Sequence, residues 1–232
     1  PMEVGPTAHY MMGGVRVVPE TGASTVPGLF AAGECSGGMH GANRLGGNSL
    51  SDLLVFGRRA GLGAAEYAKG LPALPPIDEG QVERAEREML SPFERSDGES
   101  PYAVHRDLQE VMHEKVGIFR HENDLLAALE EIEKLNARAA RCRVEGSRLF
   151  NPGWHMARDL YFMLIVSQAI ARAALLRRES RGAHSRLDYP STDAALGTVN
   201  VVVSRAGEAM KVGTAPRPAM PEDLAKLLEK KA

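Results

Sequence analysis

Hydrophobic, polar and small residues divide the chain into three stretches of different character. The first stretch, to about residue 70, is rich in glycine and poor in charge. The second, to about residue 190, is heavily charged and spaces its apolar residues as helices do. The last stretch alternates apolar and polar residues as a short β-hairpin does, and it is expected to end in a helix. Prolines just after Gly70 cannot continue a helix, so we expect domains over 1–70, 71–196 and 197–232.

The second stretch predicts a helical bundle with short connections. Its helices are expected at 81–90, 102–116, 122–142 and 155–178, the second of them entered through Pro101. The third helix places five apolar residues on one face, namely Leu125, Leu126, Leu129, Ile132 and Leu135. The fourth is the most apolar, but polar residues interrupt its apolar run. We therefore expect it to be the central core helix and not a membrane span.

The first stretch predicts two short strands and one helix. The strands are expected at 14–18 and 29–32, the second of them buried. A glycine-rich loop then leads to a helix from about residue 52 to 69, with Ser49 or Ser51 as its cap.

The last stretch predicts strands at 198–203 and 209–212, joined by a turn over 205–208. Together these elements predict the α+β class: a partial α/β domain followed by an α-helical bundle with a small β-hairpin.

Composition narrows the class of protein. Of 232 residues, 44% are hydrophobic and 25% are charged, which is typical of a soluble globular protein. The near-balance of 28 Lys+Arg against 30 Asp+Glu argues against binding to nucleic acid or to an anionic membrane by charge alone. Cys35 and Cys142 are too few for a disulfide framework, which favours a reducing, cytoplasmic setting. The sequence predicts no strand or helix before the polar cluster near residues 7–10, so we expect the chain to be a piece of a longer protein.

Two features of the first stretch point to chemistry. Glu34 follows the second predicted strand, where a carboxylate can accept hydrogen bonds from the hydroxyls of a nucleotide cofactor, although an acid that caps a turn is the commoner explanation of this pattern. Arg44 lies in the glycine loop before a helix N-terminus, a place that favours negative charge. Its planar guanidinium fits a carboxylate, although a solvated surface arginine has the same sequence pattern.

The histidines and one glycine spacing give weaker signals. His9 could hold a substrate carboxylate or be a structural residue. His105, His113 and His121 are eight residues apart, which does not keep them on one helix face. No metal site is therefore expected. The spacing of Gly41 and Gly46 is that of a phosphate loop, but the lysine that such a loop needs is absent.

The chain resembles the flavoprotein subunit of succinate dehydrogenase and fumarate reductase. The resemblance rests on PTAHYMMGGVRV at 6–17, TVPGLFAAGECSGGMHGANRLGGNSLSDLLVFGRRAG at 25–61 and ESRGAHSRLDYPSTD at 179–193. It implies the C-terminal part of an FAD-binding domain over 1–70, followed by the family's helical C-terminal domain. The third segment is expected to be structural, with its arginines and histidine tying the last bundle helix to the flavin domain.

The resemblance also implies site residues. His9 and Arg44 match the residues that bind the two carboxylates of the substrate. Glu34 matches the acid that contacts the FAD ribityl chain, and Ser49 and Leu50 match residues whose backbone reaches the flavin ring. The arginine that moves a proton in the family has no counterpart in this chain, so the catalytic residue is unassigned.

The implied activity is the interconversion of succinate and fumarate, with hydride exchanged with FAD. The implied partners are an iron–sulfur subunit, which passes electrons to a quinone, and membrane anchor subunits, without a membrane span of the chain's own. The expected location is cytoplasmic, on the inner face of the cell membrane. Because the G-x-G-x-x-G unit is absent, we expect the chain alone to be inactive. Two alternatives are an L-aspartate oxidase-type flavoenzyme and a non-catalytic module that docks an electron-transfer partner.

Overall fold

A computed structural model of the chain describes residues 2–5, 8–207 and 209–229. Pro6 and Thr7 of the first matched segment, and Glu208 of the predicted turn, lie outside the described residues. By its contacts the chain divides into two compact units. The first comprises residues 1–91 with 181–184, and the second comprises 92–180 with 185–232. The domain limits predicted at 70 and 196 stay a prediction.

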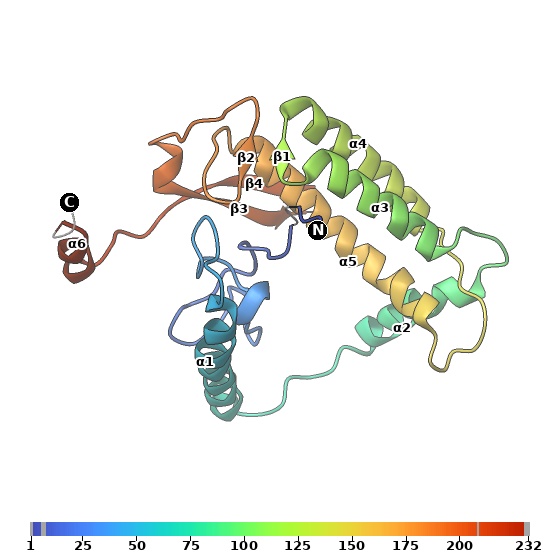
Figure 1. The fold of residues 1–232 in the computed structure, drawn as a ribbon. Coiled ribbons are helices and arrows are strands. Elements are labelled where there is room, and N and C mark those ends of the chain that lie inside the picture. Colours follow the sequence, from blue (N-terminus) through green and yellow to red (C-terminus); the bar gives the residue numbers. More distant parts are fainter. Residues whose placement is uncertain (1, 6–7, 208, 230–232) are drawn as a thin grey trace. The chain divides into compact units, whose positions relative to one another are not determined.

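The described elements are mostly helical (Figure 1). In chain order they are the 3-10 helix η1 (Gly33–Cys35), α1 (Asn48–Gly70), α2 (Glu79–Glu94), α3 (Pro101–Val116), β1 (Phe119–Arg120), α4 (Glu122–Ala139), α5 (Pro152–Leu176), β2 (Ser185–Arg186), the 3-10 helix η2 (Leu196–Thr198), β3 (Val199–Ala206), β4 (Ala209–Pro216) and α6 (Glu222–Glu229). The mixture of helices with small sheets confirms the predicted α+β class.

The core of the second unit lies between α3, α4 and α5, which pack side by side (Figure 1). Each helix buries residues spaced three and four apart, which is the spacing that keeps them on one face. The buried set is Val104, Leu108, Val111, Leu125, Ala128, Ile132, Leu135, Leu160, Leu164, Ala171 and Ala174. The alanines among them let neighbouring backbones approach closely. The predicted bundle is therefore confirmed.

Several details of the bundle differ from the prediction. Helix α2 is longer than 81–90, α4 ends at Ala139 and not at 142, and α5 ends at Leu176 and not at 178. Leu126 is 45% exposed, and Ala128 takes its expected place in the core, because the buried face of α4 follows a 3-4-3 spacing from Leu125. Helix α5 begins three residues before the predicted start. Pro152 suits a first helical position, and the Asn151 side chain accepts a hydrogen bond from Trp154 N at 3.0 Å.

Helix α5 is central to the bundle but only partly covered. Its buried residues are Leu160, Leu164, Ser167, Ala171 and Ala174, whereas Tyr161, Phe162, Ile165 and Val166 are exposed. Among the described residues it is the one helix long and apolar enough to cross a membrane, and 28% of its most apolar window is buried. The core helix of a soluble protein meets the same criterion.

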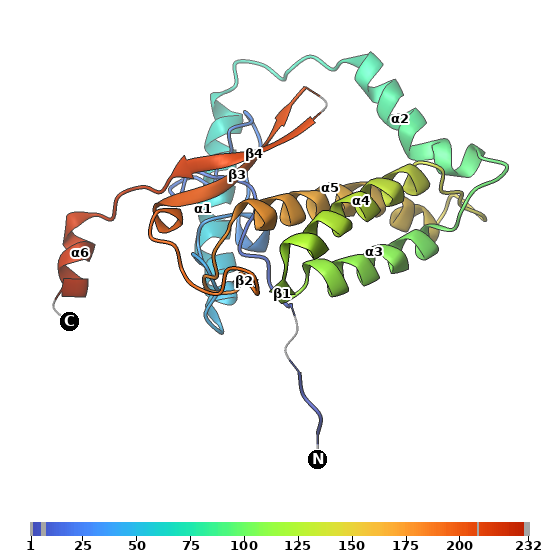
Figure 2. The same cartoon turned by 90° about the horizontal axis from the view of Figure 1, so that it is seen from above.

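The β3–β4 hairpin lies beside α5 (Figure 2). Its antiparallel register pairs Val199 with Pro216 and Ala206 with Ala209. Both strands are longer than predicted because the pairing continues to Pro216, while Thr198 belongs to η2.

A buried ionic cluster joins the ends of the bundle helices. Arg186 is fully buried, and its Nε and terminal nitrogen donate to the two Asp188 oxygens at 2.8 and 2.7 Å. Its other terminal nitrogen donates to the Ala174 carbonyl at 2.8 Å. Asp188 also accepts from the Glu122 backbone N–H at 3.0 Å, at the start of α4. The Arg186 guanidinium holds the pKa of the Asp188 carboxyl well below its usual range.

A fully buried acid lies close to this cluster in the sequence. Glu179 is completely buried, accepts a hydrogen bond from the Asp193 backbone N–H at 2.7 Å and is paired with Arg177. The Arg177 guanidinium also donates to the Val199 carbonyl at 2.8 Å. Because a buried charge needs a partner, these contacts fix the segment after α5 against the start of the hairpin.

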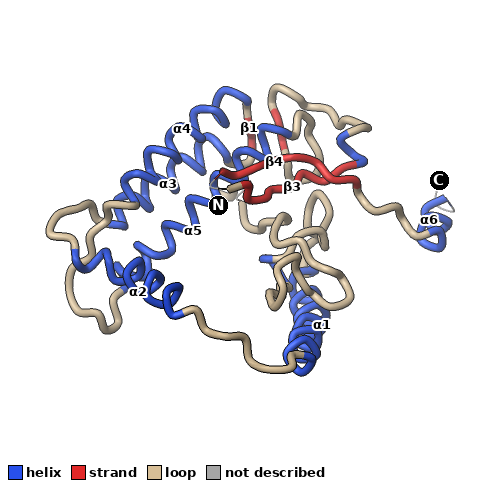
Figure 3. The backbone as a smooth tube through the Cα atoms, turned by 180° about the vertical axis from the view of Figure 1, so that it is seen from behind, coloured by secondary structure: helices blue, strands red, loops and turns tan. Residues whose placement is uncertain are grey.

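The first unit is mostly loops and turns around α1 (Figure 3). The strands predicted at 14–18 and 29–32 are wrong as continuous strands. Val15 and Val17 form isolated bridges to different partners, and Phe30 forms one with Ala23. Single bridges do not propagate into a ladder. The second segment is also less buried than predicted, with Leu29 47% exposed.

Candidate functional site

The glycine-rich loop ends in the N-terminus of α1. The helix begins at Asn48 and its cap is Gly47, at φ 83°, with no side-chain hydrogen bond to the cap. The predicted serine caps are therefore wrong, because glycine takes this left-handed conformation at little cost. Ser49 lies inside the first turn and its hydroxyl accepts a hydrogen bond from Arg44 at 3.4 Å.

Arg44 is half-buried and lacks an ion-pair partner in the described part of the chain. One terminal nitrogen donates to the Leu45 carbonyl at 3.3 Å and to Ser49. Its Nε is a buried nitrogen that meets no acceptor among the described residues. The guanidinium carbon lies 4.5 Å from the centre of the Tyr10 ring, a cation–π distance. The charge of Arg44 is therefore open to an external anion.

Tyr10 is supported from its other side by a buried pair. The His40 ring meets it edge to face, with centroids 5.3 Å apart and planes at 83°. His40 Nε2 lies 3.2 Å from Asp52 Oδ2, and these two side chains are 7% and 2% exposed. The other Asp52 oxygen is buried with no hydrogen-bond partner among the described residues. Sequence reasoning missed all three residues, because nothing in their spacing joins them.

Electrostatics around Tyr10 keep its hydroxyl protonated. Burial is the main cause that raises the pKa of Tyr10, and the carboxylates of Asp52 and Glu34 raise it further, whereas Arg44 lowers it. The ring therefore stays neutral at physiological pH.

Glu34 lies in η1, just before the glycine loop. Its Oε1 accepts a hydrogen bond from the Met11 backbone N–H at 3.0 Å, and the side chain is exposed. The short helix starts at Gly33, which is buried at φ 76°, and a β-carbon there would come within 2.7 Å of the Leu53 side chain. The carboxylate is thus held on an ordered backbone with room for a second hydrogen-bond donor.

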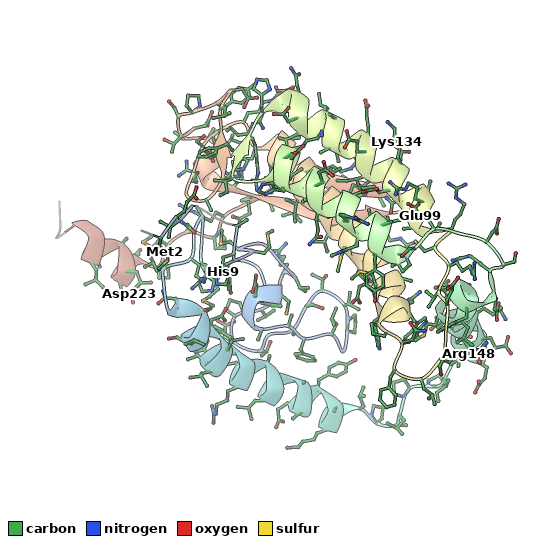
Figure 4. All side chains as sticks on the ribbon, turned by 45° about the vertical axis from the view of Figure 1, so that its right-hand side comes forward. Met2, His9, Glu99, Lys134, Arg148 and Asp223 are labelled. Carbon is green, nitrogen blue, oxygen red and sulfur yellow. The ribbon has the colours of Figure 1, made fainter. Side chains whose placement is uncertain are left out.

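His9 and Leu50 are both exposed. His9 lies on a loop, not on a helix or strand (Figure 4). It is the chain neighbour of Tyr10, and the Tyr10 ring contacts Arg44. The two predicted substrate residues are therefore linked through one residue, whereas Leu50 is in the first turn of α1 with its side chain 68% exposed.

The segment 181–184 contacts the same glycine loop. The Ala183 backbone N–H donates to the Ala42 carbonyl at 2.9 Å. Gly182 lies at φ 59°, and a β-carbon there would come within 2.3 Å of the Ala42 oxygen. This contact lies within the first unit, so the expected tie between the last bundle helix and the flavin domain stays a prediction. Arg186, expected to take part, is buried in the ionic cluster with Asp188.

The other features that could carry chemistry are two cysteines, possible metal ligands and a cavity. Cys35 is exposed and Cys142 is buried, and both are free thiols. Within the described ranges no three His, Cys, Asp or Glu side chains gather in a way that could hold a metal ion. A cavity of about 540 Å³ in the second unit is lined by Phe93, Arg95, Arg148 and their neighbours, and none of the lining residues is one that the sequence predicted to act.

Two family models match the chain. Residues 105–224 match the fumarate reductase flavoprotein C-terminal family, and residues 1–50 match an FAD-binding domain. The first match covers the three bundle helices and the hairpin. The second covers Glu34 in η1 and the glycine loop that carries Arg44, up to Leu50.

Named relatives agree with these models. The fumarate reductase flavoprotein subunit of Haemophilus influenzae is 39% identical over 83% of this chain and 33% of its own length. The protein of the same name from Mycobacterium tuberculosis is 40% identical over 92% of this chain and 38% of its own. The structure of Mycobacterium smegmatis Sdh1 in complex with UQ1 superposes with a TM-score of 0.93 at 52% identity, over 98% of this chain and 39% of that one. The chain thus spans only 33–39% of the length of these relatives.

Proposed function

This chain belongs to the succinate dehydrogenase and fumarate reductase flavoprotein family, and on that premise we propose that it forms the C-terminal part of a flavoprotein subunit that interconverts succinate and fumarate. FAD is the cofactor of this family. The observation that carries the proposal is the half-buried Arg44, which has no ion-pair partner among the described residues and lies in the loop that leads to α1.

The residues proposed to hold FAD are Glu34, Ser49 and Leu50. They fit the group, because the exposed Glu34 carboxylate can accept from ribityl hydroxyls. At the N-terminus of α1, which Gly47 caps without a side chain, the Ser49 backbone N–H meets no carbonyl outside the helix among the described residues and can face the flavin edge, whereas the Leu50 N–H already donates to the Gly47 carbonyl at 3.1 Å. When bound, FAD supplies the hydride acceptor and donor. The 232 residues contain no G-x-G-x-x-G unit, and we propose that they do not hold FAD by themselves.

The residues proposed to bind substrate are His9 and Arg44, one for each carboxylate of the diacid. Charge-assisted hydrogen bonds of this kind contribute about 1.5–3 kcal/mol each. Holding both ends of the diacid would orient its central C–C bond, which is the positioning part of catalysis. The proton-transfer residue is not assigned to this chain.

The proposed partners are an iron–sulfur subunit that passes electrons to a quinone, and membrane anchor subunits that hold the complex at the inner face of the cell membrane. The names of the relatives support this, since they are described as flavoprotein subunits and one structure contains UQ1. The division into domains at 70 and 196 is part of the same proposal.

The test uses the flavoprotein subunit that contains these residues, purified with its FAD. We expect succinate-dependent reduction of a soluble dye, and fumarate reduction in the reverse assay. Arg44→Ala should lower kcat/KM about 10- to 100-fold or more, and His9→Ala should do likewise. Flavin absorbance reports whether each variant still carries the cofactor.

The matched control is Arg59→Ala. Arg59 also rests on an aromatic ring, with its guanidinium carbon 5.2 Å from the Phe56 centroid, but it lies on the exposed side of α1. This variant should keep wild-type kinetics. Equal losses in Arg44→Ala and Arg59→Ala, or turnover of L-aspartate in place of succinate, would contradict the proposal.

A further inference from the structure

The direction of the Arg44 guanidinium is set by a ring and not by an acid. Both of its hydrogen bonds are long, at 3.3 and 3.4 Å, and its Nε has no acceptor among the described residues. The Tyr10 ring at 4.5 Å is its most extensive contact of those that the structure gives. The second terminal nitrogen of Arg44 makes no hydrogen bond among the described residues and, unlike Nε, is not among the buried unpaired atoms, so this N–H group is left for a carboxylate.

The Tyr10 ring is itself held by contacts that reach α1. The His40 ring packs edge-on against it, and the buried Asp52 carboxylate holds His40 through the 3.2 Å contact. Asp52 is in the second turn of a 23-residue helix, which is a rigid element. A series of contacts therefore runs from α1 through two rings to Arg44.

This arrangement leaves Arg44 without an ion pair to Asp52, although Asp52 contacts the same group of rings. Asp52 Oδ2 is paired with His40, and the Tyr10 ring contacts both the His40 ring and the Arg44 guanidinium. An acid in direct contact with Arg44 would compete with a substrate carboxylate for the same N–H groups. Here the Asp52 carboxylate contacts His40 and faces the Tyr10 hydroxyl, and not the guanidinium.

We propose that Tyr10, His40 and Asp52 are positioning residues, which orient the Arg44 guanidinium for one carboxylate of a small dicarboxylate. This inference rests on the proposed function and deepens it. It assigns the selection of a diacid over a monoacid partly to the Tyr10 ring that contacts Arg44. A misdirected guanidinium loses the fork geometry for one carboxylate of the diacid, while His9 can still bind the other.

The test measures the dissociation constant of a non-reacting diacid, malonate, and of a monoacid, propionate, by calorimetry on the FAD-loaded subunit. Tyr10→Leu removes the ring and should weaken malonate binding about tenfold, with much less effect on propionate. Tyr10→Phe restores the ring without the hydroxyl and should recover most of the lost affinity. The matched control Phe56→Leu removes the ring under Arg59 and should leave malonate binding unchanged.

A double-mutant cycle separates positioning from general destabilisation. Asp52→Ala releases His40 and should weaken malonate binding several-fold in the wild-type background, but it should add little in the Tyr10→Leu background, because Asp52 acts only through Tyr10. Thermal unfolding confirms that each variant is folded.

The outcomes are distinguishable. If Tyr10→Leu and Phe56→Leu have equal effects, if Tyr10→Phe is as damaging as Tyr10→Leu, or if the double variant is additive, the inference is wrong while the proposed function stands. If the wild-type protein binds no dicarboxylate, the proposed function fails, and the inference fails with it.

Discussion

The Asp188 carboxylate offers the sharpest test of what holds the bundle together. Asp188→Asn keeps the size of the side chain but removes the charge that faces the fully buried Arg186. Breaking a buried pair by removing one partner costs about 3–5 kcal/mol. Asparagine keeps one acceptor oxygen, so we expect the lower end, about 3 kcal/mol of unfolding free energy. Urea unfolding of the chain at pH 7, followed by far-UV circular dichroism, measures it.

The same change predicts a pH dependence with a definite sign. Because Arg186 lowers the folded-state pKa of Asp188, the pair stabilises the fold fully above the unfolded-state pKa, about 3.9. That contribution is lost as the pH falls below this value towards the lower folded-state pKa. The difference in unfolding free energy between wild type and Asp188→Asn should therefore shrink between about pH 4 and pH 2.

The matched control is Asp124→Asn, an exposed acid in the first turn of α4. It loses a favourable interaction with the helix dipole, about 0.3–1 kcal/mol. The reasoning is refuted if both variants lose the same free energy at pH 7. It is also refuted if the loss in Asp188→Asn is the same at pH 7 and pH 2.5.

Three further predictions concern separate features. Ile132→Ala should cost about 2–5 kcal/mol in urea unfolding, because its side chain is fully buried, while Leu126→Ala should cost under about 1 kcal/mol. A smaller gap would contradict the assignment of the α4 core face. Phe150→Gly should raise the unfolding free energy by about 1 kcal/mol, since Phe150 is 99% exposed at φ 53°, which glycine adopts without strain; a fall in thermal stability would refute this. With a disulfide-exchange reagent, Cys35 should react in the native chain and Cys142 only on unfolding, because Cys142 is 1% exposed and burial raises its pKa; two fast thiols would show that Cys142 is accessible.

The helical part of the fold could be predicted from sequence because its signals are local. Pro101 and the 3.6-residue spacing of Val104, Leu108 and Val111 define α3 without any distant contact. Errors arose where tertiary contacts decide. Leu126 is as apolar as Leu125, and only the direction of the neighbouring helices leaves it exposed.

The site was predictable in part for the same reason. Glycines before a helix mark Arg44, and the resemblance to a family adds His9 and Glu34. The contacts of Arg44 with Tyr10, and of His40 with Asp52, join positions 34 and 12 residues apart. No periodicity along the chain encodes such pairs, and the spacing of charges gives no sign that Asp52 is buried.

The hydrogen bond between Ala183 and Ala42 has a consequence for biosynthesis. A ribosome releases the polypeptide from its amino end, and the two bonded residues are 141 positions apart. About 5–20 residues are added per second, so roughly 7–30 seconds separate the emergence of the loop that contains Arg44 from that of the segment 181–184, which bonds to it. A nascent chain therefore spends this interval without the backbone bond to Ala42, and translation that stops before residue 183 leaves a product in which that bond never forms.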